Sequence, residues 1–128
     1  MDWEYDLIDS DILMIKSSGE FSSYDLLNMI KQISGDKRWK PDKNIILDFR
    51  ELNLANINLE DIYLSVFIHS QFNDVIGEGK IAAIHKDYPG FGLSELYEGV
   101  SSRFVKSKYA TFRDIGNALE WINGIGNP

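Results

Sequence analysis

The sequence predicts an α/β domain in which an N-terminal hairpin precedes alternating helices and strands. Two short β-prone runs open the chain, two later apolar runs have the length of buried strands, and amphipathic helical patterns separate these runs. Alternating strands and helices are typical of a largely parallel sheet with helices packed against it. We therefore expect a mixed, mostly parallel sheet of four or five strands with about four helices.

The size and composition of the chain fit one domain with a substantial core. The chain has 128 residues, of which 44% are hydrophobic and 26% are charged. These fractions are near globular averages, and a chain of this length buries roughly two-thirds of the surface that its unfolded form exposes. We expect a single domain over residues 1–128, with its core in about 3–122.

The first elements are a hairpin and a helix. Residues 3–8 (WEYDLI) and 12–18 (ILMIKSS) are β-prone and flank the turn-prone sequence DSD. Ser22 and Asp25 have the spacing of a capping box, which predicts a helix that opens at Ser22 and ends before residues 34–43. The predicted inner face of this helix consists of Leu26, Met29, Ile30 and Ile33.

The middle of the chain repeats the pattern of strand, helix and strand. Residues 45–49 (IILDF) form a continuous apolar run, as expected of a strand covered on both faces. Asn58 and Asp61 again have cap spacing, and the helical pattern runs from Asn58 to about Val75. Residues 80–85 (KIAAIH) are a further strand of the buried type.

The last third of the chain predicts helix, strand and helix. The first helix is indicated by apolar residues at helical spacing, followed by a strand at residues 103–109 (RFVKSKY). Thr111 and Asp114 have the spacing of a capping box, so the final helix is expected to begin at Thr111. Residues 123–128 are expected to fray. The inner faces of the two helices are Leu93, Leu96, Tyr97 and Val100, then Ile115, Ala118, Leu119 and Ile122.

Charge and composition exclude several classes of function. A net charge of -7 and a pI near 4.7 oppose binding to a nucleic acid backbone. The absence of cysteine excludes disulfides, thiolate catalysis and cysteine metal sites. The acidic start MDWEYD is unlike a signal peptide, and no apolar run approaches the roughly 18 residues of a transmembrane helix. We expect a cytoplasmic protein without a transmembrane segment.

Polar residues follow the two central strands at the edge where ligands collect in parallel sheets. A histidine near carboxylates can perform acid–base chemistry or hold a metal, so an enzyme using His85 with Asp48 or Asp87 is one hypothesis. The sequence contains no nucleophile motif and no metal-ligand spacing, so we expect strand-end ion pairs, without catalytic residues, a metal or a cofactor. The ligand candidates at this edge are Asp48, Arg50, Asn56, Asn58, His85, Asp87 and Tyr88.

Several blocks from about Asn44 to Ile122 resemble the bacterial SpoIIAA-like proteins related to STAS domains: IILDFRELN, NLEDI, KIAAIH, FGLSELYEG and TFRDIGNALEWI. The resemblance implies a mixed sheet of four or five strands, a general shape shared with CRAL-TRIO lipid-binding domains, and non-enzymatic function. In partner-switching STAS proteins, a kinase phosphorylates a serine at the corresponding helix start. Here Asn56 and Asn58 occupy that region, and no serine or threonine lies between Asp48 and Tyr63. The serine switch is therefore not expected.

The helix over 58–75 is the strongest candidate for a partner interface, because apolar residues lie on two sides of it. One stripe can meet the sheet; the other is either covered by a neighbouring helix or forms an interface. The first stripe is Leu59, Ile62, Tyr63, Val66 and Phe67, and the candidate interface is Leu64, Ile68, Phe72 and Val75.

Two functional hypotheses follow from these patterns. The leading hypothesis is a non-enzymatic binding or regulatory module that acts through this helix, as a homodimer or with another protein. The alternative is a small carrier of a lipid-like or other apolar molecule. The carrier hypothesis predicts a cavity lined by residues such as Phe67, Phe72, Phe91 and Tyr97.

Overall fold

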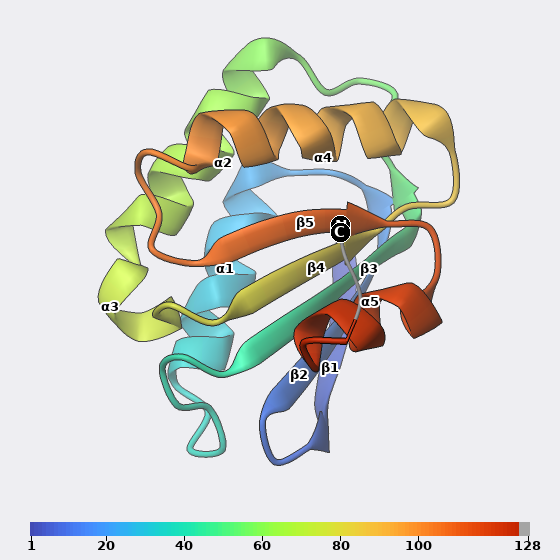
Figure 1. The fold of residues 1–128 in the computed structure, drawn as a ribbon. Helices are drawn as coiled ribbons and strands as arrows, with labels where there is room; N and C mark the ends of the chain where they lie inside the picture. Colours follow the sequence, from blue (N-terminus) through green and yellow to red (C-terminus); the bar gives the residue numbers. More distant parts are fainter. Residues whose placement is uncertain (126–128) are drawn as a thin grey trace.

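Five strands form one mixed sheet in the order β1-β2-β3-β4-β5 (Figure 1). The computed structural model describes residues 1–125. β1 and β2 form the predicted antiparallel hairpin, and β2, β3, β4 and β5 run parallel to one another. The mostly parallel sheet is thus confirmed. The strands are β1 Asp2–Asp9, β2 Ile12–Glu20, β3 Asn44–Asn53, β4 Lys80–Ile84 and β5 Lys108–Phe112.

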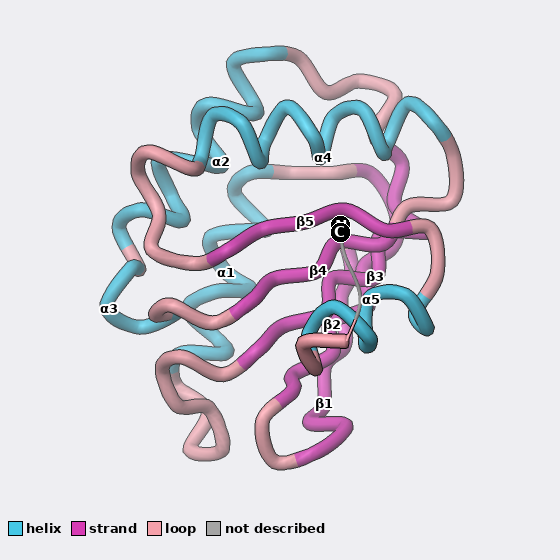
Figure 2. The backbone as a smooth tube through the Cα atoms, in the orientation of Figure 1, coloured by secondary structure: helices cyan, strands magenta, loops and turns pink. Residues whose placement is uncertain are grey.

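Helices cover both faces of the sheet. In Figure 2, α5 lies in front of the sheet, whereas α1 and α2 lie behind it. Within residues 1–125, no helix is long and apolar enough to cross a membrane. The helices are α1 Ser23–Ser34, α2 Leu59–Gln71, α3 Asn73–Ile76, α4 Tyr88–Ser101 and α5 Ile115–Ile122.

The two faces of the sheet carry separate hydrophobic clusters, because successive side chains of a strand point to opposite faces. One cluster packs under α5 and includes the small residues Ala82 and Ala110, which are paired neighbours on β4 and β5. The opposite cluster includes Ile45 and Ile81, which are paired on β3 and β4, and Met29 of α1. This second cluster lies on the face of the sheet that α1 covers.

Two predicted helix starts agree with the structure. The Ser22 side chain accepts a hydrogen bond from the Asp25 backbone N–H at 3.2 Å. Asn58 and Asp61 form both bonds of a capping box, with distances of 2.9 and 3.0 Å. Both caps are local side-chain-to-backbone contacts, which explains why the residue spacing located them.

The predicted end of the second helix at Val75 is wrong, because α2 ends at Gln71. Phe72 has φ −111° and ψ 21°, and the short α3 follows it. The Asn73 side chain donates to the Phe104 carbonyl at 2.9 Å and accepts from the Lys106 N–H at 3.1 Å. These bonds tie α3 to the loop before β5.

That loop also explains two further corrections. Residues 103–107 form turns in place of the predicted strand, and β5 begins only at Lys108. Thr111 is paired with Ala83 inside the sheet, so it cannot open the last helix. Asp114 is the N-cap of α5, and its carboxylate accepts the Asn117 N–H at 2.8 Å. Of the segment predicted to fray, residues 126–128 lie outside the described part of the chain.

Candidate ligand-binding site

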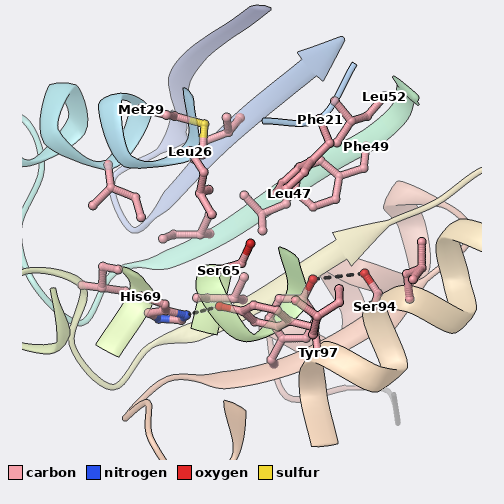
Figure 3. Close-up of a pocket in the computed structure, with 18 of the residues that line it drawn as sticks. Phe21, Leu26, Met29, Leu47, Phe49, Leu52, Ser65, His69, Ser94 and Tyr97 are labelled. Carbon is pink, nitrogen blue, oxygen red and sulfur yellow. Dashed lines mark hydrogen bonds between the residues drawn. The ribbon is translucent and has the colours of Figure 1, made fainter. Parts of the chain in front are cut away.

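An apolar cavity of about 130 Å³ lies between the sheet and helices α1, α2 and α4 (Figure 3). Protein cores contain few voids larger than a water molecule. An engineered apolar cavity of about 150 Å³ stays dry and binds benzene, so this cavity has the size for a ring-sized apolar group. Its walls include Leu26 and Met29 of α1, Leu47 of β3, Ser65 of α2, and Ser94 and Tyr97 of α4.

One polar pair in the cavity wall joins α2 to α4. The Tyr97 hydroxyl lies 2.8 Å from His69 Nδ1, and Ser107 Oγ lies 3.5 Å from His69 Nε2. Ser107 donates its proton to the Gly77 carbonyl at 2.9 Å, so it accepts from the imidazole and leaves Nδ1 to accept from Tyr97. Burial lowers the pKa of His69 from 6.5 to about 4. His69 is therefore neutral at pH 7.

A second polar group in the wall joins β4, α4 and β5. Ser94 Oγ is hydrogen-bonded to His85 Nε2 and lies 3.1 Å from the Tyr109 hydroxyl. Both hydroxyl protons have a partner when Tyr109 donates to Ser94 and Ser94 donates to His85. In that arrangement the neutral imidazole carries its proton on Nδ1. Burial lowers the pKa of His85 to about 4, while the nearby Asp87 carboxylate acts in the opposite direction.

A groove of about 410 Å³, lined by both polar and apolar residues, lies at the carboxyl ends of β3 and β4. Its positively charged residues are Arg50 and Lys86, and its negatively charged residues are Glu51 and Asp87. The groove therefore has no excess of either charge. The cavity and the groove share four wall residues, namely Phe49, Leu52, Leu54 and His85.

The structure brings three of the predicted ligand-edge residues to this groove: Arg50, His85 and Asp87 line it. Asp48 is 2% exposed and forms a two-point ion pair with Arg50, whose Nε and Nη2 lie 2.9 and 2.8 Å from its carboxylate oxygens. These hydrogen bonds hold the pKa of Asp48 below its usual range. The side chain of Asp48 is thus occupied by a structural contact.

The other three candidates lie outside the groove. Asn56 donates to Glu20 at 2.8 Å, Asn58 caps α2, and Tyr88 is 76% exposed at the start of α4. Sequence reasoning did not single out Ser94 or Tyr109 as site residues. Their contacts with His85 depend on tertiary packing, and a serine on an apolar helix face has no signature of its own.

The predicted interface strip of α2 is not one exposed surface. Leu64 is 45% exposed, but Ile68 is only 8% exposed, and Phe72 and Val75 are covered by or packed against the domain's own core. A different set of large side chains on α2 is exposed, because α2 packs against α4 and α1 and buries the side that carries Ile62, Ser65 and His69. The exposed set is Leu59, Tyr63, Leu64 and Phe67.

The carrier hypothesis named four aromatic cavity residues, and the structure places one of them, Tyr97, in the wall. Phe67 is 58% exposed on the outer side of α2, and Phe72 and Phe91 lie outside the cavity lining. Within residues 1–125, no group of three or more histidine, aspartate or glutamate side chains is arranged to hold a metal ion.

Comparison with known proteins establishes the fold. No protein-family model matches the chain, and no curated protein matches it. One similar solved structure is an uncharacterized protein from the DUF3478 family, with a SpoIIAA-like fold, from Shewanella loihica PV-4. The match covers 94% of this chain and 92% of that chain, with a TM-score of 0.59 and 16% sequence identity. The chain therefore has a SpoIIAA-like fold.

Proposed function

We propose that this domain is a non-enzymatic module that binds a small, mainly apolar molecule in the cavity between the sheet and helices α1, α2 and α4. The observation that carries the proposal is the cavity of about 130 Å³, whose lining is almost entirely apolar. Moving the apolar part of a ligand from water into this lining is favourable by about 25 cal/mol per Å² of apolar surface buried. A ligand that binds the folded protein alone also makes it more stable.

The polar groups of the wall support binding rather than catalysis. The His69 imidazole and the Tyr97 hydroxyl bond to each other, and Ser94 is held between Tyr109 and His85. These bonds satisfy buried groups that would otherwise be costly next to apolar side chains. The first experiment is native mass spectrometry of freshly purified protein, which reports a retained small molecule as extra mass.

A cavity-filling variant, Ser65→Leu, tests the site directly. Ser65 is 4% exposed, lines the cavity, and donates only to the Asp61 carbonyl of its own helix at 2.8 Å. The added carbon atoms are smaller than the void, so we expect the ligand-free variant to gain about 1–2 kcal/mol of stability. We also expect it to lose the rise in Tm that ethylbenzene produces in the wild type.

Ser65→Ala is the matched control, because it removes the same hydroxyl but leaves the cavity open. It should retain the rise in Tm with ethylbenzene. The proposal is contradicted if neither ethylbenzene nor acetophenone stabilises the wild type, or if Ser65→Leu responds to them as strongly as Ser65→Ala.

A second candidate function, contact with a second copy of this chain, is supported by the outer face of α2. Leu59, Tyr63 and Phe67 are 52%, 55% and 58% exposed and lie one turn apart along the helix. Glu60 is the only acidic residue among the exposed positions of α2. Two copies of this face could therefore pack together with little burial of charge, even though each chain carries a net charge of -7.

The double variant Tyr63→Asp/Phe67→Asp tests this contact. We expect the wild type to sediment as a dimer and the variant to sediment as a folded monomer, because two carboxylates would be buried without partners. Tyr24→Asp is the control, since Tyr24 is a 71% exposed aromatic residue in the first turn of α1. A monomeric wild type, or equal dimerisation of both variants, would rule out this contact.

A further inference from the structure

The wall between the cavity and the groove contains one polar side chain, His85. The other shared wall residues, Phe49, Leu52 and Leu54, are apolar. His85 is 3% exposed, directly follows β4 and lines both the cavity and the groove. A ring nitrogen of His85 can therefore contact a molecule that occupies both the cavity and the groove.

One nitrogen of His85 is available for such a contact. Nε2 is hydrogen-bonded to Ser94. The arrangement that gives both hydroxyl protons a partner, with Tyr109 donating to Ser94 and Ser94 donating to Nε2, puts the imidazole proton on Nδ1. Residues 1–125 provide no hydrogen-bond acceptor for Nδ1. The nearby Asp87 carboxylate instead accepts the Gly90 N–H as the cap of α4, at 3.3 Å. The Nδ1–H group is thus a donor without a protein partner, and it is not among the fully enclosed unpaired polar atoms of the described residues, so a ligand or water in the groove can accept from it.

Gly90 keeps this edge of the imidazole open. A Cβ atom at position 90 would lie 2.6 Å from His85 Nδ1 and 3.2 Å from Leu54 Cδ1. Any other residue would therefore press on two side chains of the shared wall. Gly90 also lines the groove, so Nδ1 is adjacent to the space that a ligand would enter.

We propose that the cavity and the groove form one site for an uncharged amphiphile that has an apolar, ring-sized part and a hydrogen-bond acceptor such as a ketone oxygen. The apolar part fills the cavity and the acceptor oxygen bonds to His85 Nδ1–H. This inference rests on the proposed function, because it assigns the chemical class of the molecule that the cavity binds.

The charges around the wall favour an uncharged ligand. Arg50 is already bonded to Asp48, and the groove balances Arg50 and Lys86 against Glu51 and Asp87. A charged group at His85 would meet groove charges of both signs and so gain no net attraction, while it would lose part of its hydration. His85 is neutral at pH 7, because burial lowers its pKa to about 4, and so it offers a dipole rather than a charge.

Acetophenone and ethylbenzene test whether an acceptor oxygen on the ligand bonds to His85, since they have similar shapes and differ by a carbonyl oxygen. Dissociation constants are measured for both by NMR titration of the wild type and of His85→Leu. We expect the ratio of the dissociation constant of ethylbenzene to that of acetophenone to fall about fivefold in His85→Leu, because only acetophenone loses a hydrogen bond. Comparing ratios removes the different hydration of the two probes, as in a double-mutant cycle.

Gly90→Ala provides an independent variant, because its methyl group would occupy the space beside Nδ1 and push against the imidazole without removing it. It should lower the same ratio about fivefold. Gly92→Ala is the matched control on the same helix, because a Cβ there has no neighbour within 4 Å. It should keep the wild-type ratio.

The outcomes separate the two proposals. If neither probe binds the wild type, the proposed function and this inference both fail. If both probes bind but the ratio is unchanged in His85→Leu and Gly90→Ala, the cavity is a binding site and the assignment to His85 is wrong. If benzoate binds as tightly as acetophenone, the ligand class is not uncharged. Should His85→Leu fail to fold, Gly90→Ala and Gly92→Ala decide the question.

Discussion

Acidification from pH 7 to pH 5 is expected to lower the free energy of unfolding by about 2 kcal/mol for each of two buried histidines. Burial lowers the pKa values of His69 and His85 from 6.5 to about 4. Between these values the unfolded chain binds a proton at each histidine and the folded chain does not. Stability therefore decreases as the pH falls through this window.

Denaturant unfolding at pH 7, 6 and 5 measures this effect, and His85→Leu separates the two histidines. The variant should lose about half of the pH dependence in this window, whatever its stability at pH 7. Burial and the neighbouring Glu95 raise the pKa of Glu98, which acts in the opposite direction near pH 5. Because Glu98 is present in both proteins, its contribution cancels in the comparison. An identical pH dependence in the wild type and the variant would contradict the prediction.

This acid sensitivity is a consequence of how the cavity wall is built. His69 and His85 each supply a neutral hydrogen-bonding partner to a hydroxyl from α4, Tyr97 and Ser94 respectively. Protonation would convert His69 Nδ1 from an acceptor to a donor, so the Tyr97 hydroxyl would have to accept and its own proton would lose its partner. The contacts that hold α4 over the cavity are therefore the contacts that acid weakens. Ligand binding and stability should decline over the same pH range.

The order of strands and helices predicted the mostly parallel sheet, and local contacts made two helix starts predictable. The caps at Ser22 and Asn58 involve a side chain and a backbone N–H three residues apart, so residue spacing alone located them. Near the C-terminus, the same spacing predicted a cap at Thr111, which is wrong. Thr111 pairs with Ala83 in the sheet, and this contact joins segments far apart in the sequence.

The candidate site was only partly predictable for the same reason. The rule that ligands collect at strand ends located Arg50, His85 and Asp87, because it requires only the order of the elements. The cavity depends on space left between side chains of β3, α1, α2 and α4, which periodicity cannot measure. Helical spacing placed Tyr97 on an inner face, but an inner face predicts a core residue as well as a cavity wall.

In β3, the substitution Arg50→Gln is expected to lower the free energy of unfolding by about 3 kcal/mol at pH 7. Removing one partner of a buried ion pair leaves the other charge uncompensated, at a cost of about 3–5 kcal/mol. Asp48 is 2% exposed, whereas the Arg50 side chain is 39% exposed, so the lower end of this range applies. Urea unfolding of the two proteins measures the difference.

The pH dependence of that difference identifies the ion pair as its cause. Arg50 lowers the pKa of Asp48, so the pair's contribution is fully present above the unfolded value of about 3.9 and is lost as the pH falls through the lower folded value. The gap between the wild type and Arg50→Gln should therefore shrink below about pH 4. The double variant Asp48→Asn/Arg50→Gln should be more stable than Arg50→Gln at pH 7, because no charge remains buried. If the double variant is no more stable and the gap is equal at pH 7 and pH 3, Arg50 stabilises the end of β3 through packing, and its charge would then be free for a ligand in the groove.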